Sequence, residues 1–110
     1  MTDLPTTDGA DERPAGDLDI RDAPERRRYE ASSDGTVAGF LAYRPSPDGL
    51  RLVHTQVDPA FEGHGIGGRL ARFALDRARA SGERVVVECP FVRSWLRRHR
   101  EYDDDVAPRS

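Results

Sequence analysis

A glycine-rich segment in the middle of the chain separates two different periodicities. It reads Glu62-Gly63-His64-Gly65-Ile66-Gly67-Gly68. Residues 50–57 before it (LRLVHTQV) alternate as a β-strand does, whereas the residues after it recur at helical spacing. The predicted helix has an apolar face of Ile66, Leu70, Phe73, Ala74 and Ala78, and a polar face of Arg69, Arg72, Asp76 and Arg79. Ser81-Gly82 is expected to end this helix, since glycine readily takes a left-handed conformation.

The flanking sequence predicts the rest of the fold. Strands are expected at residues 28–31, 36–43 and 50–57, with turns at 33–35 and 44–49. Such short turns can join only antiparallel neighbours. A strand at 84–89 and a short helix at 91–100 follow the central helix, and the helix is expected to turn Phe91, Val92, Trp95 and Leu96 inward. We therefore predict an α/β (α+β) mixed sheet, in which an antiparallel meander precedes one βαβ unit and a short C-terminal helix.

Charge divides the 110-residue chain into two parts. Residues 1–24 hold seven acidic residues and two arginines, so we predict a disordered acidic tail there. Residues 25–110 form the expected domain, with 15 arginines and 13 acidic residues. This weak positive charge argues against a nucleic-acid partner and suits a small anionic ligand. The sequence shows neither a membrane span nor a signal peptide, which favours a soluble, cytoplasmic protein without a membrane partner.

The glycine segment suits a phosphate-bearing ligand, because exposed N–H groups and a helix N-terminus attract phosphate. A turn that merely lets helix and strand pack closely is the simpler alternative. A P-loop is excluded, since no Gly-Lys-Ser/Thr is present. A dinucleotide fingerprint at Gly63, Gly65 and Gly68 has the wrong context: five residues separate it from the strand, and too little chain follows for further crossovers.

Three motifs resemble those of GNAT-type N-acetyltransferases. Val57-Asp58-Pro59 followed by residues 62–67 is similar to the coenzyme A pyrophosphate signature of that superfamily. His54-Thr55-x-Val57 and Cys89-Pro90-Phe91-Val92-x-x-Trp95 further resemble its short, single-domain branch. The resemblance covers residues 26–104 and implies an abbreviated GNAT-like fold.

The resemblance also implies a ligand and its site. Acetyl-CoA would be the cosubstrate, with no metal, and its pyrophosphate would bind the backbone of Gly63, His64, Gly65, Ile66, Gly67 and Gly68. The backbone of Gln56 and Val57 would pair with the pantetheine arm as an added strand does. The usual Arg or Gln of the signature is Glu62 here. We expect this carboxylate to face away from the phosphates.

Two side chains are candidates for chemistry. His54 is the nearest candidate base, since imidazole changes charge near neutral pH, or it is a strand-edge residue bonded to backbone. Cys89 is an acyl carrier, a residue lining the thioester site, or apolar filler. As the single cysteine, it excludes an internal disulfide and a multi-cysteine zinc site. Whether the two side chains meet depends on a register that stays open at this point.

The predicted function is transfer of an acetyl group from coenzyme A to an amine by direct attack in a ternary complex. The acceptor is an amine-bearing small molecule or protein. A non-enzymatic acyl-CoA binding module is the alternative. The helical segment that larger relatives insert between their first two strands is missing, so the acceptor pocket is expected to be open or completed by another subunit. An exposed sheet edge would permit a homodimer.

Overall fold

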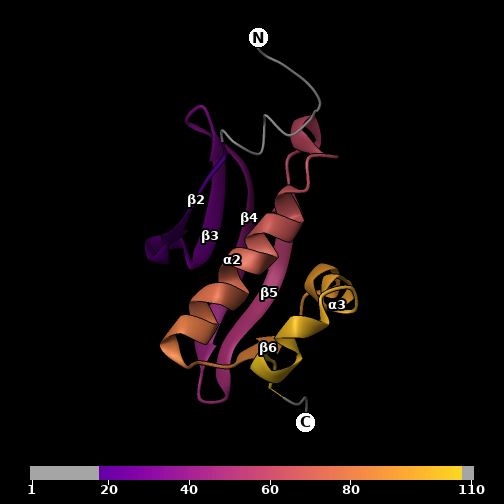
Figure 1. The fold of residues 1–110 in the computed structure, drawn as a ribbon. Coiled ribbons are helices and arrows are strands. Elements are labelled where there is room, and N and C mark those ends of the chain that lie inside the picture. Colours follow the sequence, from indigo (N-terminus) through magenta and orange to yellow (C-terminus); the bar gives the residue numbers. More distant parts are fainter. Residues whose placement is uncertain (1–17, 108–110) are drawn as a thin grey trace.

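The computed structural model describes residues 18–107, which form a five-stranded mixed sheet in the order β2-β3-β4-β5-β6 (Figure 1). The strands are β2 (Leu18–Ala23), β3 (Arg28–Ser33), β4 (Thr36–Ser46), β5 (Gly49–Val57) and β6 (Val85–Val87). β2 to β5 pair antiparallel, and β6 lies parallel to β5. The predicted fold class is confirmed, with one more antiparallel strand than the sequence indicated.

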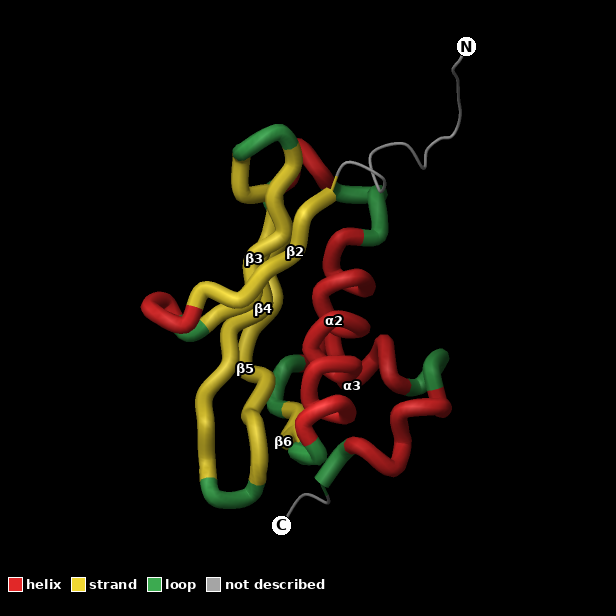
Figure 2. The backbone as a smooth tube through the Cα atoms, turned by 60° about the vertical axis from the view of Figure 1, so that its left-hand side comes forward, coloured by secondary structure: helices red, strands yellow, loops and turns green. Residues whose placement is uncertain are grey.

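Two α-helices cover one face of this sheet (Figure 2). They are α2 (Ile66–Ser81), which connects β5 to β6, and α3 (Pro90–Leu96), which follows β6. Three short 3-10 helices complete the described chain: η1 (Pro24–Arg26), η2 (Pro59–Phe61) and η3 (Arg100–Asp105). No helix within residues 18–107 is long and apolar enough to cross a membrane.

Local sequence explains the two hairpins. Asp34 and Gly35 both have positive φ, as a two-residue turn that follows the strand twist requires. The second hairpin is longer than predicted, because β4 continues through Pro45 to Ser46. A proline is tolerated there because β3 pairs with β4 only as far as the Arg28–Ala42 pair, so no neighbour needs the missing N–H.

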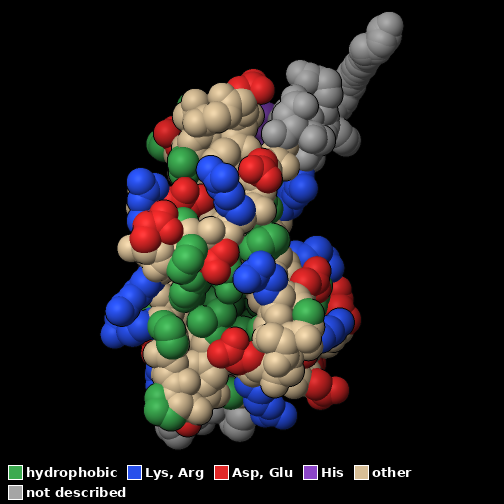
Figure 3. Space-filling view, turned by 90° about the vertical axis from the view of Figure 1, so that its left-hand side faces the viewer, with side chains coloured by type: hydrophobic (Ala, Val, Ile, Leu, Met, Phe, Trp, Pro, Cys, Tyr) green, Lys and Arg blue, Asp and Glu red, His purple; other side chains and the backbone are tan. Residues whose placement is uncertain are grey.

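The structure corrects the predicted boundary of the acidic tail. Residues 18–23 are not disordered but form edge strand β2, in full register with β3. Its apolar side chains Leu18 and Ile20 pack against the core, and Figure 3 shows apolar side chains gathered on this side of the molecule. The Tyr43 hydroxyl donates a hydrogen bond of 2.5 Å to Asp22. Residues 1–17 of the predicted tail lie outside the described residues.

The core lies between the sheet and α2. Its largest fully buried members are Leu41, Leu52, Leu70, Leu75, Val85, Val92 and Cys89. The buried face of α2 contains four of the five predicted residues, Ile66, Leu70, Ala74 and Ala78, and also Ala71 and Leu75, which the prediction missed. Phe73 is half-buried, and its ring meets Tyr29 edge-on at 5.3 Å. Two C-terminal predictions need correction. The last strand ends at Val87 rather than residue 89, because α3 begins at Pro90, and Phe91 of that helix is 42% exposed rather than buried.

Asp22→Ala should lower the free energy of unfolding by about 1–3 kcal/mol, the cost of leaving a half-buried hydroxyl without its charged acceptor. The same change removes the ion pair between Asp22 and Arg77. Asp19→Ala, on the exposed face of the same strand, is the control and should change stability by less than about 0.5 kcal/mol. Urea denaturation measures both. Equal stability of the two variants would contradict a stabilising role for this contact.

Stability should also fall at alkaline pH because of Tyr43. Burial, and then the neighbouring Asp22, raise the pKa of this phenol well above its ordinary value. The folded state thus holds a proton that the unfolded state loses above about pH 10, so the contribution is present below that pH and is lost as pH rises. Urea midpoints measured from pH 8 to 11 should fall less steeply in Tyr43→Phe.

Candidate active site

The site lies where β5 and β6 stop pairing. The two strands pair over only three positions, Leu50–Val85 to Leu52–Val87. Beyond them the Leu52 carbonyl accepts hydrogen bonds from both Glu88 N–H (2.9 Å) and Cys89 N–H (3.0 Å), which turns the chain away from β5. An ion pair between Arg51 and Glu88 spans the same junction. From residue 53 to 57, β5 therefore runs on with an edge that β6 does not cover.

A β-bulge decides which side chains of β5 face the helices. Ala42 of β4 pairs with His54, but the next residue, Tyr43, pairs with Leu52, so Val53 is an extra residue. An extra residue reverses the alternation of the strand. Leu52 before the bulge and Thr55 after it therefore share the helix-covered face, whereas His54 faces the other side.

Cys89 lies buried at this junction, 2% exposed. Its Sγ is 3.2 Å from Thr55 Oγ1 on the uncovered part of β5. Cys89 is also the N-cap residue of α3. The structure thus places the thiol where β5, β6 and α3 meet, with a hydroxyl as its hydrogen-bonding partner.

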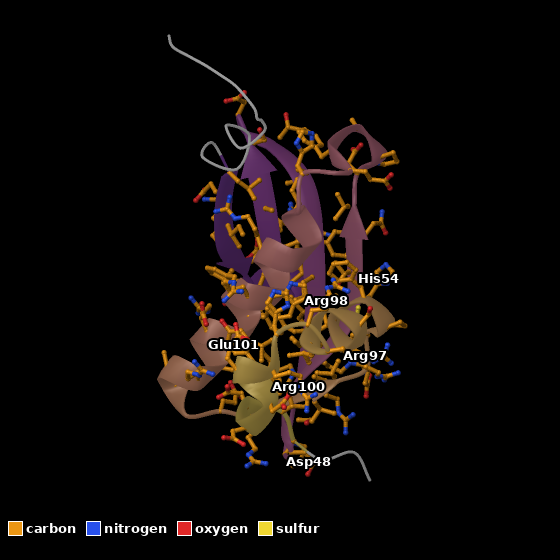
Figure 4. The ribbon with its side chains drawn as sticks, turned by 45° about the vertical axis from the view of Figure 1, so that its right-hand side comes forward. Asp48, His54, Arg97, Arg98, Arg100 and Glu101 are labelled. Atoms are coloured by element: carbon orange, nitrogen blue, oxygen red, sulfur yellow. The ribbon has the colours of Figure 1, made fainter. Side chains whose placement is uncertain are left out.

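His54 is exposed and, because of the bulge, lies on the opposite face of the sheet. Figure 4 labels it on β5. Its Nε2 lies 3.4 Å from Gln56 Oε1, and its ring centroid is 6.0 Å from that of Phe40. The structure does not bring His54 and Cys89 together, because adjacent strand residues point to opposite faces. A relay in which His54 takes the proton of the Cys89 thiol directly is not supported by this geometry.

The glycine segment forms a loop at the end of β5. Asp58 caps η2 by accepting a 2.9 Å hydrogen bond from Ala60 N–H. Gly63 and Gly65 then adopt φ of 89° and 72°, a region that other residues enter at a cost, and α2 starts at Ile66. Glu62 and His64 are exposed. The first N–H groups of α2 have no partner within the helix, so the loop and the helix present donors to an anion.

These features fit the coenzyme that the sequence predicts. The carbonyl of Gln56 faces β4, since it lies 2.8 Å from the position of a methyl group on Gly39. In an alternating strand the backbone groups of Thr55 and Val57 then face the uncovered edge. Val57 is one of the two predicted pantetheine contacts, whereas the backbone of Gln56 already faces a neighbouring strand.

The rings of Trp95, His99 and Tyr102 form a cluster that the sequence alone did not predict. Trp95 stacks on His99, with ring centroids 3.8 Å apart, and Tyr102 is buried beside them. The Tyr102 hydroxyl donates to Asp76 at 2.6 Å, and burial followed by this carboxylate raises its pKa. Long-range contacts hold η3 against α2: this bond of Tyr102 to Asp76 and the 2.7 Å ion pair of Arg79 with Asp105.

Two arginines, Arg97 at the end of α3 and Arg100 in η3, lie beside a cavity. Arg97 and Arg100, labelled in Figure 4, line a volume of about 530 Å³ together with Val87 and Leu96. Asp103 lines it too and forms a 2.7 Å ion pair with Arg100. This cavity is lined by α3, η3 and the last residues of the described chain, whereas the glycine loop lies at the N-terminus of α2.

The diverging parallel strands and the glycine loop between β5 and α2 define a GNAT-like fold. A family model described as GCN5-related N-acetyl-transferase matches residues 28–106. The chain belongs to this family. No curated protein matches the sequence.

Two solved structures share the fold. A GCN5-like protein from Staphylococcus aureus is 19% identical with a TM-score of 0.65, covering 86% of this chain and 92% of that one. The ribosomal-protein-alanine N-acetyltransferase from Brucella melitensis biovar Abortus 2308 is 22% identical with a TM-score of 0.51, covering 76% of this chain and 62% of that one.

Burial predicts that Cys89 reacts slowly with an aromatic disulfide reagent. The folded protein should react at least about 100-fold more slowly than the protein in urea, because the thiol is reached only through local opening. Thr55→Val, which removes the hydroxyl partner and keeps the shape, is a test of the contact and should change the rate severalfold. Stopped-flow absorbance measures both. A rate equal to that in urea would show that Cys89 is accessible.

Proposed function

We propose that the protein binds acetyl-CoA and transfers the acetyl group to an amine acceptor. One observation carries this proposal: the uncovered edge of β5 leads from the buried Cys89 thiol directly to the glycine loop. In this proposal the thioester lies at the Cys89 end of that edge, the pantetheine arm along the edge, and the pyrophosphate at the glycine loop. Membership of the GCN5-related family supports the same ligand.

The chain's own residues divide the binding of the coenzyme. The backbone from Gly63 to Gly68 binds the pyrophosphate through N–H donors and the positive end of α2. Thr55 and Val57 pair with the amide groups of the pantetheine arm as a neighbouring strand would. Glu62, exposed beside the loop, leaves the main chain as the source of phosphate contacts.

When bound, acetyl-CoA would supply an activated thioester. The acceptor nitrogen would attack its carbonyl carbon, the carbon–sulfur bond would break, and coenzyme A would leave as the thiolate, which takes up a proton to give the thiol. The acceptor must then lose a proton. His54 is the proposed base, acting from the open face of the sheet directly or through one water. Cys89 lines the thioester end. Its burial and its contact with Thr55 favour this role over that of an acyl carrier.

The acceptor would approach from the sheet face that α2 and α3 leave open (Figure 2). Phe40 and Gln56 flank His54 on this face. This face could receive an amine on a protein or peptide as well as a small molecule. A binding module without transferase activity is the second candidate, because His54 and Cys89 lie on opposite faces of β5.

Coenzyme binding is tested by a matched pair of glycines at the two ends of α2. Gly65 and Gly82 have φ of 72° and 73°, and neither has an atom within 4 Å of an added methyl group. Alanine at either position should cost about 1–2 kcal/mol of stability through the same backbone strain. Only Gly65→Ala should also weaken acetyl-CoA binding, by at least about tenfold in calorimetry. Wild-type protein that binds no acetyl-CoA at high micromolar concentration would overturn the proposed function.

Catalysis is tested separately with a panel of amines and peptides, measured by thiol release. His54→Gln should lower kcat by about 10²-fold or more and remove the acidic limb of the pH profile, because the base is lost. Gln56→Ala, on the same face, is the control and should keep that limb. Cys89→Ala should retain most activity if the thiol only lines the site, whereas an acetyl adduct on Cys89 in mass spectrometry would restore the covalent route. Coenzyme binding without turnover of any amine would favour the binding module.

A further inference from the structure

Helix α3 packs directly against the first turn of α2, at Gly67 and Gly68 of the glycine segment. A methyl group added to Gly67 would lie 2.8 Å from Phe91 Cζ and 3.0 Å from Cε2. A methyl group on Gly68 would lie 3.0 Å from Trp95 Nε1. Phe91 and Trp95 are four residues apart and therefore lie on the same face of a helix. One face of α3 thus packs on two residues of α2 that have no side chain. This contact of Gly67 and Gly68 with Phe91 and Trp95 is the seat of α3.

The other two glycines of the loop have a different reason to be glycine. Gly63 and Gly65 have positive φ and open space around the position of a side chain. Gly67 and Gly68 have no such backbone requirement and instead lie against aromatic rings. The loop therefore combines two functions: its first half bends the backbone, and its second half admits the rings of α3.

The seat also fixes the position of the Cys89 thiol. Cys89 is the N-cap of α3, its N–H donates to Leu52, and its carbonyl accepts the first helical hydrogen bond from Arg93 N–H at 3.0 Å. Arg93 Nη2 in turn donates to the Val87 carbonyl at 3.2 Å. Cys89 is therefore bonded both to α3 and to β5, so a shift of α3 relative to α2 would act on the contact between the thiol and β5.

Phe91 is unusual in its exposure. At 42% it is one of two large apolar side chains classed as exposed in residues 18–107, the other being Val37 at 37%. The outer edge of its ring lies against Gly67, while much of the residue stays accessible to solvent. An aromatic residue kept at the surface in this place is available both to the seat and to a bound coenzyme.

We infer that Phe91 is a positioning residue that couples the glycine segment, residues 62–68, to the Cys89 thiol. Its ring, held on Gly67, sets the distance between α3 and the N-terminus of α2. Occupation of the loop and the position of the thiol are thereby linked through one contact. This inference rests on the proposed function for its ligand, but the contact itself is testable without any ligand.

The test is a double-mutant cycle of Gly67→Ala and Phe91→Ala, with Val37→Ala as the control for loss of an exposed apolar side chain. The added methyl group should push the mobile end of the Phe91 ring aside, so Gly67→Ala should raise the reaction rate of the Cys89 thiol severalfold while largely preserving the thermal midpoint. In the Phe91→Ala background the same change should have no further effect, because contacting residues are not additive. Val37→Ala should leave the rate unchanged.

Coenzyme A affinity, measured by calorimetry on the same variants, gives the second readout. Gly67→Ala and Phe91→Ala should each weaken binding by about three- to tenfold, and the double variant should be no weaker than the weaker single variant. Additive losses in both affinity and thiol reactivity would overturn the inference, since they would mean that Gly67 serves only the approach of phosphate. If wild-type protein binds no coenzyme, the proposed function fails, while the thiol cycle still decides whether Phe91 positions Cys89.

Trp95 offers a spectroscopic signature of the same contact. It is the single tryptophan of the chain, and its indole N–H lies at Gly68. Coenzyme A binding should change its emission, and Phe91→Ala should reduce that change at saturating coenzyme because α3 no longer follows the loop. Binding detected by calorimetry with no change in wild-type emission would contradict the coupling.

Discussion

The architecture of the site depends on how briefly β5 and β6 pair. Three paired positions are enough to close the core beneath α2, and the pairing ends where two successive N–H groups converge on the Leu52 carbonyl. One acceptor serving two donors leaves the next strand residue with no partner on that side, so the chain must diverge. The uncovered edge of β5 and the buried position of Cys89 both follow from this divergence.

Close approach between the two helices is the second requirement. Glycines at the start of α2 cost helix stability, yet they let aromatic rings of α3 lie on the backbone. Further along, Arg72 donates to the Tyr102 hydroxyl at 3.0 Å and ties η3 to the exposed side of α2. A domain with so small a core gains rigidity from such contacts, and this rigidity can keep the glycine loop and Cys89 in a fixed relation.

Local sequence patterns were enough to predict most of the fold. The Asp34-Gly35 turn, the alternation of β5 and the helical spacing after Ile66 are each encoded within a few residues, so sequence predicted β3 to β5 and α2. The sequence did not predict β2, because its own residues are largely charged and its contacts, such as that of Asp22 with Tyr43, join residues 21 positions apart. Phe91 was expected inside because helical spacing aligns it with Trp95, but the ring meets a glycine at the rim of the site and stays 42% exposed.

The sequence by itself determined that a glycine segment joins a strand to a helix, and it offered His54 and Cys89 as candidates for the chemistry. It also supported the family, because those motifs occur in the right order. Only the tertiary structure decided which of these side chains meet. The extra residue Val53 exists as a bulge through pairing with β4, and it reverses the alternation of everything that follows in β5. For that reason Cys89 contacts Thr55 and not His54, a result that no periodicity within the strand could have given.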